Sequence, residues 1–345
     1  MVRTTSAMTV TADILLKAFD AVLADLDGVV YAGPNAIPGA VEALTALAGH
    51  GVKLAYVTNN ASRTPGQVAA HLRELGAPAE DHQVVSSAQA GAALLAEKFP
   101  AGTKVLVTGS AALAQEVQAH GMTVVDSATE VPDVVIQGFD PGLGWADLAE
   151  AGYAINAGAL WIATNTDMTI PRDRGIAPGN GTLVAAVQAA VGRQPLVAGK
   201  PEAPLFLTAA DKLHAKHPLV VGDRLDTDIL GGNKAGMATA LVLTGVDSAL
   251  TALQARTSER PRFILETLAG LYQPYPEVES RGMQFSCRDA AASVVMDAAG
   301  ERTLHIVGDP QSVDSWRAAC AAWWAAVEQS DEATAPAITW AQTLP

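Results

Sequence analysis

The sequence predicts an α/β protein with a doubly wound, Rossmann-like parallel-sheet core, an inserted α/β cap domain and a small C-terminal α+β extension. Two observations predict this fold. Short apolar runs alternate with helical patterns, and polar clusters follow several of the apolar runs. Such alternation is typical of a parallel sheet covered by helices on both faces. Hydrophobic residues make up 49% of the 345 residues, enough apolar material for more than one domain.

The core is predicted to comprise residues 12–80 and 196–268. Its first part alternates strands and helices over the ranges 21–26, 39–51, 52–60 and 64–77. Thr64 is the predicted N-cap of the last of these helices, with Pro65 at its first position. The same alternation resumes late in the chain, over the ranges 195–201, 202–217, 218–223, 227–236 and 237–245.

Residues 81–195 carry an alternation of their own, which predicts a separate inserted cap. Its strands and helices are expected at 103–109, 110–121, 122–126, 131–139, 144–158, 160–165 and 180–192. After residue 268 the composition changes, and the Pro-rich stretch 271–282 is predicted to be a linker. The rest of the extension, 269–345, is expected to hold a Trp-rich helix and three strands, at 312–329 and at 292–297, 302–309 and 336–341.

The charge and the cysteines limit the partners and the compartment. The formal net charge is −14. Because nucleic acids and anionic membranes attract basic surfaces, we expect neither as a partner. Cys287 and Cys320 have no metal-binding spacing and fit a reducing cytoplasm. The N-terminus lacks the apolar core of a signal peptide, and no apolar run is long enough to span a bilayer. We therefore expect a cytoplasmic protein, with homodimer formation left open.

Polar residues end four of the predicted core strands, in "DLDG", "TNN", "AGKP" and "GDRLDTD". Asp and Asn are common where strands become turns, so a single such motif is weak evidence. In a parallel sheet, however, the carboxyl ends of the strands share the edge where ligands bind. Three carboxylates there, Asp25, Asp27 and Asp223, require a cation, and Mg²⁺ prefers hard oxygen ligands. With Lys200 as a second positive charge, the set predicts a phosphoryl-transfer site.

In their order and spacing these motifs resemble those of the haloacid dehalogenase-like phosphatases. Within that superfamily the chain resembles the class IIA cap group, which includes nitrophenylphosphatase, phosphoglycolate phosphatase and glycerol 3-phosphate phosphatase. The resemblance covers about residues 18–248 and rests on "DLDGVV", "VTNN", "GKP" and "GDRLDTD". "ATNTDMTIP" and "GNGTLVAAVQAAVG" extend it into the cap, whereas the C-terminal extension lies outside it.

The resemblance implies roles for the acidic residues. Asp25 would be the nucleophile that forms an aspartyl-phosphate, and Asp27 the general acid and then the general base. The Asp25 carboxylate, the Asp27 backbone carbonyl and Asp223 would hold Mg²⁺. Asp228 would hold a metal-bound water or Lys200.

The resemblance also implies roles for residues around the phosphate. Thr58, the Asn59 amide and Lys200 would bind the oxygens of the transferring group. Gly28, at the turn after the first motif, and Asn60, after the second, would be supporting residues.

The resemblance leaves the roles of three further residues open. Asn165 and Asp167 match a cap motif and either contact the substrate or cap the turn that precedes Pro171. Asp226 lies inside the fourth motif but matches no required position, so we expect a solvated or capping residue.

The resemblance therefore implies a Mg²⁺-dependent phosphomonoester hydrolase that acts on a small phosphorylated metabolite. Glycerol 3-phosphate is the first expectation; phosphoglycolate or another small ester of the nitrophenyl phosphate type is the alternative. A receiver-type signalling module lacks an acid two residues after its phosphorylated Asp, and a dehalogenase needs no leaving-group acid, so Asp27 argues against both. A non-catalytic phosphate-binding protein is a further alternative.

Overall fold

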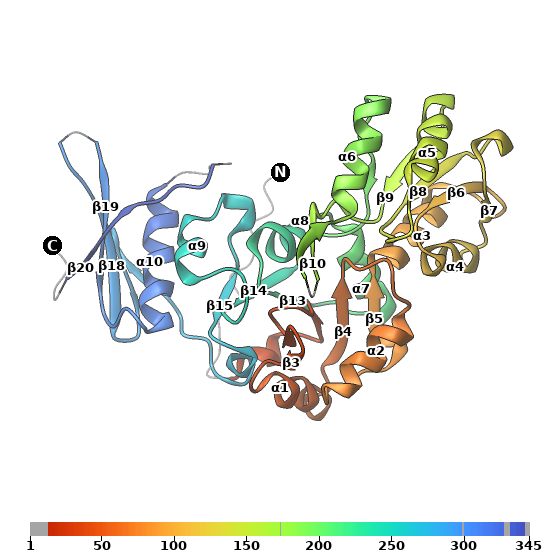
Figure 1. The fold of residues 1–345 in the computed structure, drawn as a ribbon. Helices are drawn as coiled ribbons and strands as arrows, with labels where there is room; N and C mark the ends of the chain where they lie inside the picture. Colours follow the sequence, from red (N-terminus) through yellow and green to blue (C-terminus); the bar gives the residue numbers. More distant parts are fainter. Residues whose placement is uncertain (1–12, 173, 299, 328–331, 342–345) are drawn as a thin grey trace.

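The computed structural model describes residues 13–172, 174–298, 300–327 and 332–341. Three larger sheets follow one another across the molecule: the extension at one end, the core sheet in the middle and the cap at the other end (Figure 1). Residue 12 of the predicted core and residues 328–329 of the predicted Trp-rich helix lie outside the described residues. Within the described ranges, no helix has both the length and the apolar character needed to cross a membrane.

The core sheet has six parallel strands in the order β15-β14-β13-β1-β4-β5. Their bounds are β1 Ala21–Ala24, β4 Lys53–Thr58, β5 Val84–Ser86, β13 Pro218–Gly222, β14 Ala238–Val242 and β15 Phe263–Leu265. From β1 the chain adds strands outward on one side, and from β13 it adds them outward on the other. The strand order therefore reverses between β1 and β13, which is where ligands bind on such sheets.

Helices cover both faces of the core sheet, so the predicted doubly wound fold is confirmed. Successive residues of β1 point to opposite faces: Val22 packs into one apolar cluster and Leu23 into the other. Thr64 caps α2 as predicted, because its Oγ1 accepts the Gln67 N–H at 3.3 Å and Pro65 opens the helix. The helices of this part are α1 Ala40–Ala46, α2 Pro65–Glu74, α7 Pro204–Leu213, α8 Leu230–Lys234 and α9 Ala249–Gln254.

The cap sheet has five parallel strands in the order β12-β9-β8-β6-β7. Their bounds are β6 Lys104–Thr108, β7 Thr123–Val125, β8 Val134–Gln137, β9 Leu160–Ala163 and β12 Leu196–Val197. The helices of this part are α3 Ser87–Lys98, α4 Ala111–Ala119, α5 Trp145–Ala157 and α6 Asn180–Val191. A hairpin of β10 (Thr169–Arg172) and β11 (Gly175–Pro178) lies on the side of the cap that faces the core sheet (Figure 1).

The strand pairings differ from the predicted cap limits at both ends. β5 lies after residue 81 but pairs with β4 of the core. β12 lies after residue 195 but pairs with β9 of the cap. Both strands are only two or three residues long, so their apolar content alone does not show which sheet they join.

The extension forms a five-stranded sheet in the order β16-β17-β18-β19-β20, with one long helix packed on it. Its elements are β16 Glu279–Arg281, β17 Gln284–Cys287, β18 Ala290–Met296, β19 Arg302–Val307, α10 Val313–Ala326 and β20 Ala337–Trp340. All pairs are antiparallel except β19 with β20. The predicted helix and three strands are present within the described residues, and β16 and β17 are additional.

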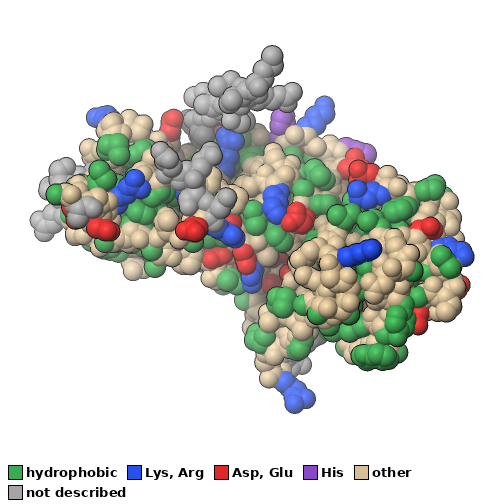
Figure 2. Space-filling model, turned by 90° about the horizontal axis from the view of Figure 1, so that it is seen from above, with side chains coloured by type: hydrophobic (Ala, Val, Ile, Leu, Met, Phe, Trp, Pro, Cys, Tyr) green, Lys and Arg blue, Asp and Glu red, His purple; other side chains and the backbone are tan. Residues whose placement is uncertain are grey.

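Short elements complete the described chain. They are the hairpin strands β2 Tyr31–Ala32 and β3 Asn35–Ala36 and the short helical turns η1 Leu15–Ala18, η2 Leu47–His50, η3 Asp81–Gln83, η4 Ala128–Glu130, η5 Leu225–Ile229, η6 Thr257–Glu259 and η7 Leu268–Tyr272. Lys, Arg, Asp and Glu side chains are scattered together over the face of the molecule seen in Figure 2.

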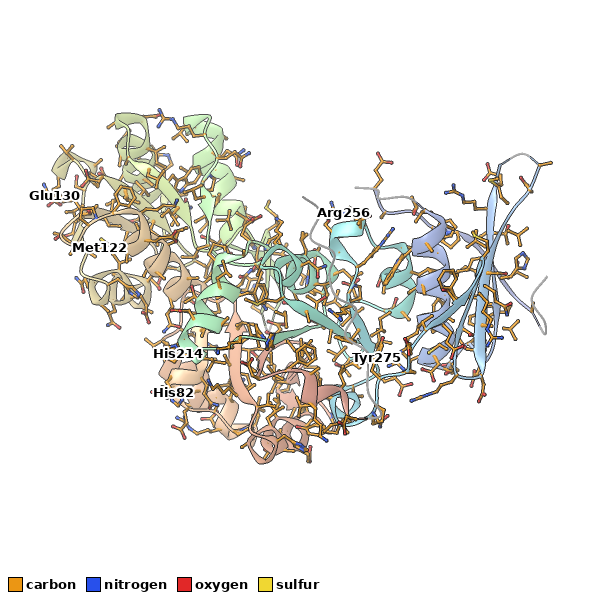
Figure 3. All side chains as sticks on the ribbon, turned by 180° about the vertical axis from the view of Figure 1, so that it is seen from behind. His82, Met122, Glu130, His214, Arg256 and Tyr275 are labelled. Atoms are coloured by element: carbon orange, nitrogen blue, oxygen red, sulfur yellow. The ribbon has the colours of Figure 1, made fainter. Side chains whose placement is uncertain are left out.

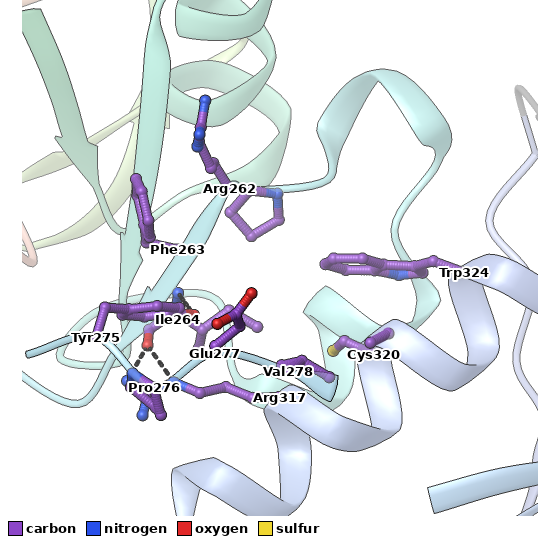
Figure 4. Close-up of a pocket in the computed structure, with 12 residues that line it drawn as sticks. Arg262, Phe263, Ile264, Tyr275, Pro276, Glu277, Val278, Arg317, Cys320 and Trp324 are labelled. Atoms are coloured by element: carbon purple, nitrogen blue, oxygen red, sulfur yellow. Dashed lines mark hydrogen bonds between the residues drawn. The ribbon is translucent and has the colours of Figure 1, made fainter. Parts of the chain in front are cut away.

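The extension covers the outer edge of the core sheet with side chains instead of a strand. β15 is the edge strand, and the carbonyl of Ile264 accepts two hydrogen bonds from the Arg317 guanidinium, at 2.6 and 3.1 Å. The N–H of Ile264 donates to the Tyr275 hydroxyl at 3.0 Å. Tyr275 lies between the core and the extension (Figure 3), beside a pocket of about 270 Å³ between β15 and α10 (Figure 4). The predicted linker therefore packs against the core.

Candidate active site

The first motif ends β1 at the point where the strand order reverses. The N–H of Asp25 continues the parallel pairing by donating to the Val221 carbonyl at 2.9 Å. The chain then turns through Gly28, which has a φ of 77°. A Cβ at this position would overlap the Asp223 carboxylate, so only glycine allows the turn to approach the fourth motif this closely. The close approach gives a physical reason for glycine at this position, and the supporting role of Gly28 stays a prediction.

Lys200 lies at the centre of the site and is 3% exposed. Its Nζ contacts Oδ1 of Asp25 and lies 2.7 Å from Oδ1 of Asp228. Burial alone would lower the pKa of Lys200, but the attraction of Asp228 and Asp25 outweighs it and raises that pKa. Lys200 is therefore a fixed positive charge between two motifs, and Asp228 contacts it, which is one of the two roles that the resemblance implies for Asp228.

Three carboxylates converge beside this lysine. Asp25, Asp223 and Asp228 each offer an oxygen, and these oxygens all lie within 4.8 Å of one another. Burial, and after it the negative charge of Asp228, raise the pKa of Asp223 to about 6. Burial raises the pKa of Asp228 to about 6 as well, with Lys200 opposing and Asp25 adding to the shift. The single positive charge of Lys200 does not balance three carboxylates. Their hard oxygen donors fit a divalent cation such as Mg²⁺.

Asp27 has a different environment from Asp25, although both follow β1. Asp27 is exposed, and its Oδ2 accepts a long hydrogen bond from the Tyr31 hydroxyl at 3.4 Å. Partial desolvation of its carboxyl raises the pKa of Asp27, and the Tyr31 contact opposes the rise. Burial raises the pKa of Asp25 too, but Lys200 stabilises its charged form. One carboxyl is thus paired with a cation and the other faces solvent.

The second motif ends β4 next to Lys200. The Thr58 hydroxyl accepts the N–H of Asn60 at 3.1 Å, and Oδ1 of Asn60 accepts the N–H of Ser62 at 2.9 Å. The side chain of Asn59 holds the backbone of Lys200: its Oδ1 accepts the Lys200 N–H at 2.8 Å and its Nδ2 donates to the Lys200 carbonyl at 3.2 Å. The Asn59 side chain therefore positions the third motif.

Both cap candidates contact the core. Asn165 is buried, and its Nδ2 donates to the Asn59 carbonyl at 2.7 Å. The carboxylate of Asp167 accepts hydrogen bonds from Nδ2 of Asn59 at 3.0 and 3.1 Å. Burial raises the pKa of Asp167, and Asn59 opposes the rise. Of the two interpretations, the contacts of Asn165 favour a structural role, while the half-buried Asp167 joins the cap to the second motif. Asp226 is exposed and pairs with Arg224 at 2.9 Å.

The sequence analysis missed a fifth segment, the loop between β14 and α9. The Thr244 hydroxyl donates to the Gly28 carbonyl at 2.6 Å, and the N–H of Val246 donates to Oδ2 of Asp223 at 2.8 Å. Gly245 packs so closely on Asp223 that a Cβ there would overlap its carboxylate. The signal available in the sequence was "TG" directly after an apolar strand.

Comparisons with known proteins identify the family of the chain. Residues 22–123 match a family model described as haloacid dehalogenase-like hydrolase, and residues 197–271 match a second one described as HAD-hydrolase-like. The chain belongs to the haloacid dehalogenase-like hydrolases, and the resemblance seen in its motifs is confirmed. The D-glycerol 3-phosphate phosphatase of Mycobacterium tuberculosis is 48% identical over 259 residues, which are 75% of this chain and 72% of the relative. An acid sugar phosphatase of Staphylococcus aureus is 37% identical over 235 residues, 68% of this chain and 90% of the relative.

Solved structures show how far the similarity extends. The glycerol phosphate phosphatase of M. tuberculosis in complex with calcium matches with a TM-score of 0.82 and 40% identity, covering 95% of each chain. The same enzyme in complex with magnesium matches with a TM-score of 0.80 and 38% identity, covering 96% of this chain and 95% of that one. A 4-nitrophenylphosphatase of Thermotoga maritima matches with a TM-score of 0.68 and 31% identity, covering 75% of this chain and 98% of that one. A 95% match must include most of the extension, since residues 269–345 are less than a quarter of the chain.

Proposed function

We propose that this protein is a Mg²⁺-dependent phosphomonoester hydrolase that cleaves glycerol 3-phosphate through an aspartyl-phosphate intermediate. The observation that carries the proposal is the contact of Lys200 with Asp25 and Asp228. These residues lie beside Asp223, and Asp25 and Asp223 follow the adjacent core strands β1 and β13. This set supplies a nucleophile, a fixed cation and a divalent-cation site within one small volume.

The two aspartates of the first motif would share the chemistry. A carboxylate oxygen of Asp25 attacks phosphorus, and the bond from phosphorus to the glycerol oxygen breaks. Asp27 gives its proton to that leaving oxygen, so glycerol departs as a neutral alcohol. Asp27 then takes a proton from water, which attacks the aspartyl-phosphate, releases inorganic phosphate and restores Asp25. Desolvation raises the pKa of Asp27, which favours the protonated form that an acid needs.

The metal would be held by Asp25, Asp223 and, as the resemblance implies, the backbone carbonyl of Asp27. When bound, Mg²⁺ would neutralise charge on the phosphate and on the carboxylates. Asp228 would hold Lys200, and Lys200 would bind a phosphate oxygen. Thr58 and the backbone amide of Asn59 would donate to the remaining oxygens, with Asn60 supporting their turn.

The substrate assignment rests on the relatives. A glycerol 3-phosphate phosphatase is 48% identical, and the solved structure of a glycerol phosphate phosphatase covers the chain to 95%. We also propose the three-part division predicted above, with β5 placed in the core and β12 in the cap. A cytoplasmic location is proposed because both cysteines are free thiols.

A panel of phosphate esters tests the function. Purified protein with Mg²⁺ is assayed for phosphate release from glycerol 3-phosphate, phosphoglycolate, several sugar phosphates and nitrophenyl phosphate. We expect the highest kcat/KM for glycerol 3-phosphate, no activity in EDTA and none in Asp25→Asn. A higher kcat/KM for another metabolite would correct the substrate, and a fully active Asp25→Asn protein would refute the covalent mechanism.

A further inference from the structure

Asp247 forms hydrogen bonds with two residues of the segment that follows β13, although it lies outside all four motifs. Its N–H donates to the backbone carbonyl of Asp223 at 3.0 Å. Its Oδ2 accepts the N–H of Leu225 at 2.7 Å. One residue of the β14–α9 loop thus fixes both the carbonyl of a proposed metal ligand and the start of η5.

The contact with Leu225 matters because η5 carries Asp228. The first N–H groups of a helical turn have no partner within it and need an acceptor from elsewhere. The N–H of Arg224 is satisfied by Oδ2 of Asp228 at 3.2 Å, and that of Leu225 by Asp247. Without Asp247, the Leu225 N–H would lose its acceptor and η5 would be free to shift, taking Asp228 away from Lys200.

The helix that follows this loop, α9, contacts the extension at its C-terminal end. α9 begins two residues after Asp247, at Ala249. Nε1 of Trp324 in α10 donates to the carbonyl of Leu253 at 3.2 Å, and the N–H of Thr334 donates to that of Gln254 at 3.2 Å. The end of α9 is therefore tied to the extension while its start is tied to the acidic cluster.

We propose that Asp247 is a positioning residue for the metal site. It sets the affinity for Mg²⁺ by fixing the position of Asp223 relative to η5. The proposal rests on the proposed function, since it assumes that Asp223 binds the metal. Residues that orient metal ligands typically change metal affinity by about 10–100-fold when they are removed. Asp247 should therefore act on Mg²⁺ binding more than on turnover of the loaded enzyme.

Four proteins test this: wild type, Asp247→Ala, Asp247→Asn and the control Asp226→Ala. Asp226 lies in η5 itself, but its carboxylate accepts hydrogen bonds from the Arg224 guanidinium and not from the backbone that Asp247 holds. The control therefore removes a nearby negative charge and leaves the contacts of Asp247 in place. The Mg²⁺ concentration at half-maximal rise in melting temperature is measured, together with kcat at saturating Mg²⁺. For Asp247→Ala we expect that concentration to rise about tenfold or more, with kcat changed less than about twofold. Asp247→Asn, which keeps an acceptor, and Asp226→Ala should stay within about threefold of wild type.

The outcomes separate the two proposals. A folded Asp247→Ala protein with wild-type Mg²⁺ affinity overturns the positioning role, and so does an equal loss in Asp226→Ala, because that loss would be an effect of charge alone. If Asp247→Ala does not fold, Asp247→Glu replaces it: a weaker affinity despite the retained charge supports positioning, and an unchanged affinity overturns it. A wild-type protein without any Mg²⁺-dependent rise in melting temperature overturns both the positioning role and the proposed function.

Discussion

Asp25 and Asp27 are separated by one residue, yet their surroundings suit them to opposite tasks. Asp25 contacts a buried lysine, which favours its charged, nucleophilic form. Asp27 is exposed to solvent and forms no ion pair with the described residues. Desolvation raises the pKa of both carboxyls, but only Asp25 has a lysine in contact that opposes the rise. Pairs of carboxyl groups whose environments differ in this way divide the acid and nucleophile roles between them.

The role of Asp27 can be tested by the choice of leaving group. An alkyl alkoxide needs a proton to leave, whereas nitrophenolate leaves readily without one. Asp27→Asn should therefore lower kcat/KM for glycerol 3-phosphate about 10²–10⁴-fold and that for nitrophenyl phosphate much less. A pre-steady-state burst of nitrophenolate would show that the second step is also impaired. Equal slowing of both substrates without a burst would mean that Asp27 is not the acid.

The buried acidic cluster should make the metal-free protein sensitive to pH. The folded-state pKa of Asp223 is about 6, above the ordinary value of 3.8. The folded state therefore binds the proton more tightly than the unfolded state, and stability falls as pH rises from about 4 to 6. The difference between the folded-state and the ordinary pKa of Asp223 lowers the free energy of unfolding of the metal-free protein by on the order of 3 kcal/mol above pH 6.

Asp223→Asn should accordingly raise the melting temperature in EDTA, by several degrees above pH 6 and little near pH 4. Mg²⁺ should raise the melting temperature of the wild type but not that of the variant. Thermal unfolding across pH 4–8, with and without Mg²⁺, measures both effects. A variant that melts below the wild type in EDTA at pH 7 would contradict this account.

At the scale of elements, the turn after β1 depends on a glycine for two reasons that can be separated. Gly28 and Gly33 both have positive φ, 77° and 59°. A Cβ at Gly28 would overlap Asp223, whereas a Cβ at Gly33 would meet nothing within 4 Å. Gly33→Ala should lose about 1–2 kcal/mol of stability from backbone strain and keep Mg²⁺ binding. Gly28→Ala should lose stability and also Mg²⁺ binding. The affinity of each variant for Mg²⁺ is measured by titration at a temperature at which both variants are folded.

The elements also show what sequence could and could not predict. Three of the motifs were predictable because they follow β1, β4 and β13, apolar strands whose ends share one edge of the core sheet. The motif of Lys200 follows β12 of the cap sheet, and its place in the site was predictable from the resemblance. The loop with Val246 and Asp247 was missed because its contacts use backbone N–H groups, which any residue supplies, and one carboxylate among many. β12 was assigned to the wrong side of a boundary because two apolar residues fit either sheet. The sequence predicted a linker around Tyr275 because the aromatic contact that orders it comes from Arg317, far along the chain.

At the scale of the whole molecule, the extension covers the exposed edge strand of the core sheet. β15 is an edge strand, and an unpaired edge is a site for aggregation. Arg317 satisfies the Ile264 carbonyl and pairs with Asp314 at 2.6 Å, and both side chains are largely buried. α10 also completes an apolar cluster that contains Leu225 and Ile229 of η5. The extension therefore stabilises the side of the core that carries the fourth motif.

Arg317 should consequently control stability without taking part in the chemistry. Arg317→Met keeps the bulk of the side chain but leaves the Ile264 carbonyl without its donor and Asp314 with only the exposed Arg288, 3.0 Å away. A buried charge left wholly unpaired costs about 3–5 kcal/mol. Because Arg288 still compensates part of the Asp314 charge, we expect a smaller loss of stability that still lowers the urea midpoint. Arg281→Met is the matched control, because Arg281 is exposed and lies 3.7 Å from its acidic neighbour, Glu279, and exposed pairs contribute about 0–1 kcal/mol. Below its unfolding transition, Arg317→Met should hydrolyse substrate at the wild-type rate, since Arg317 contacts none of the four motifs in the described residues. A stable variant with reduced kcat would show instead that the extension acts on the reaction itself.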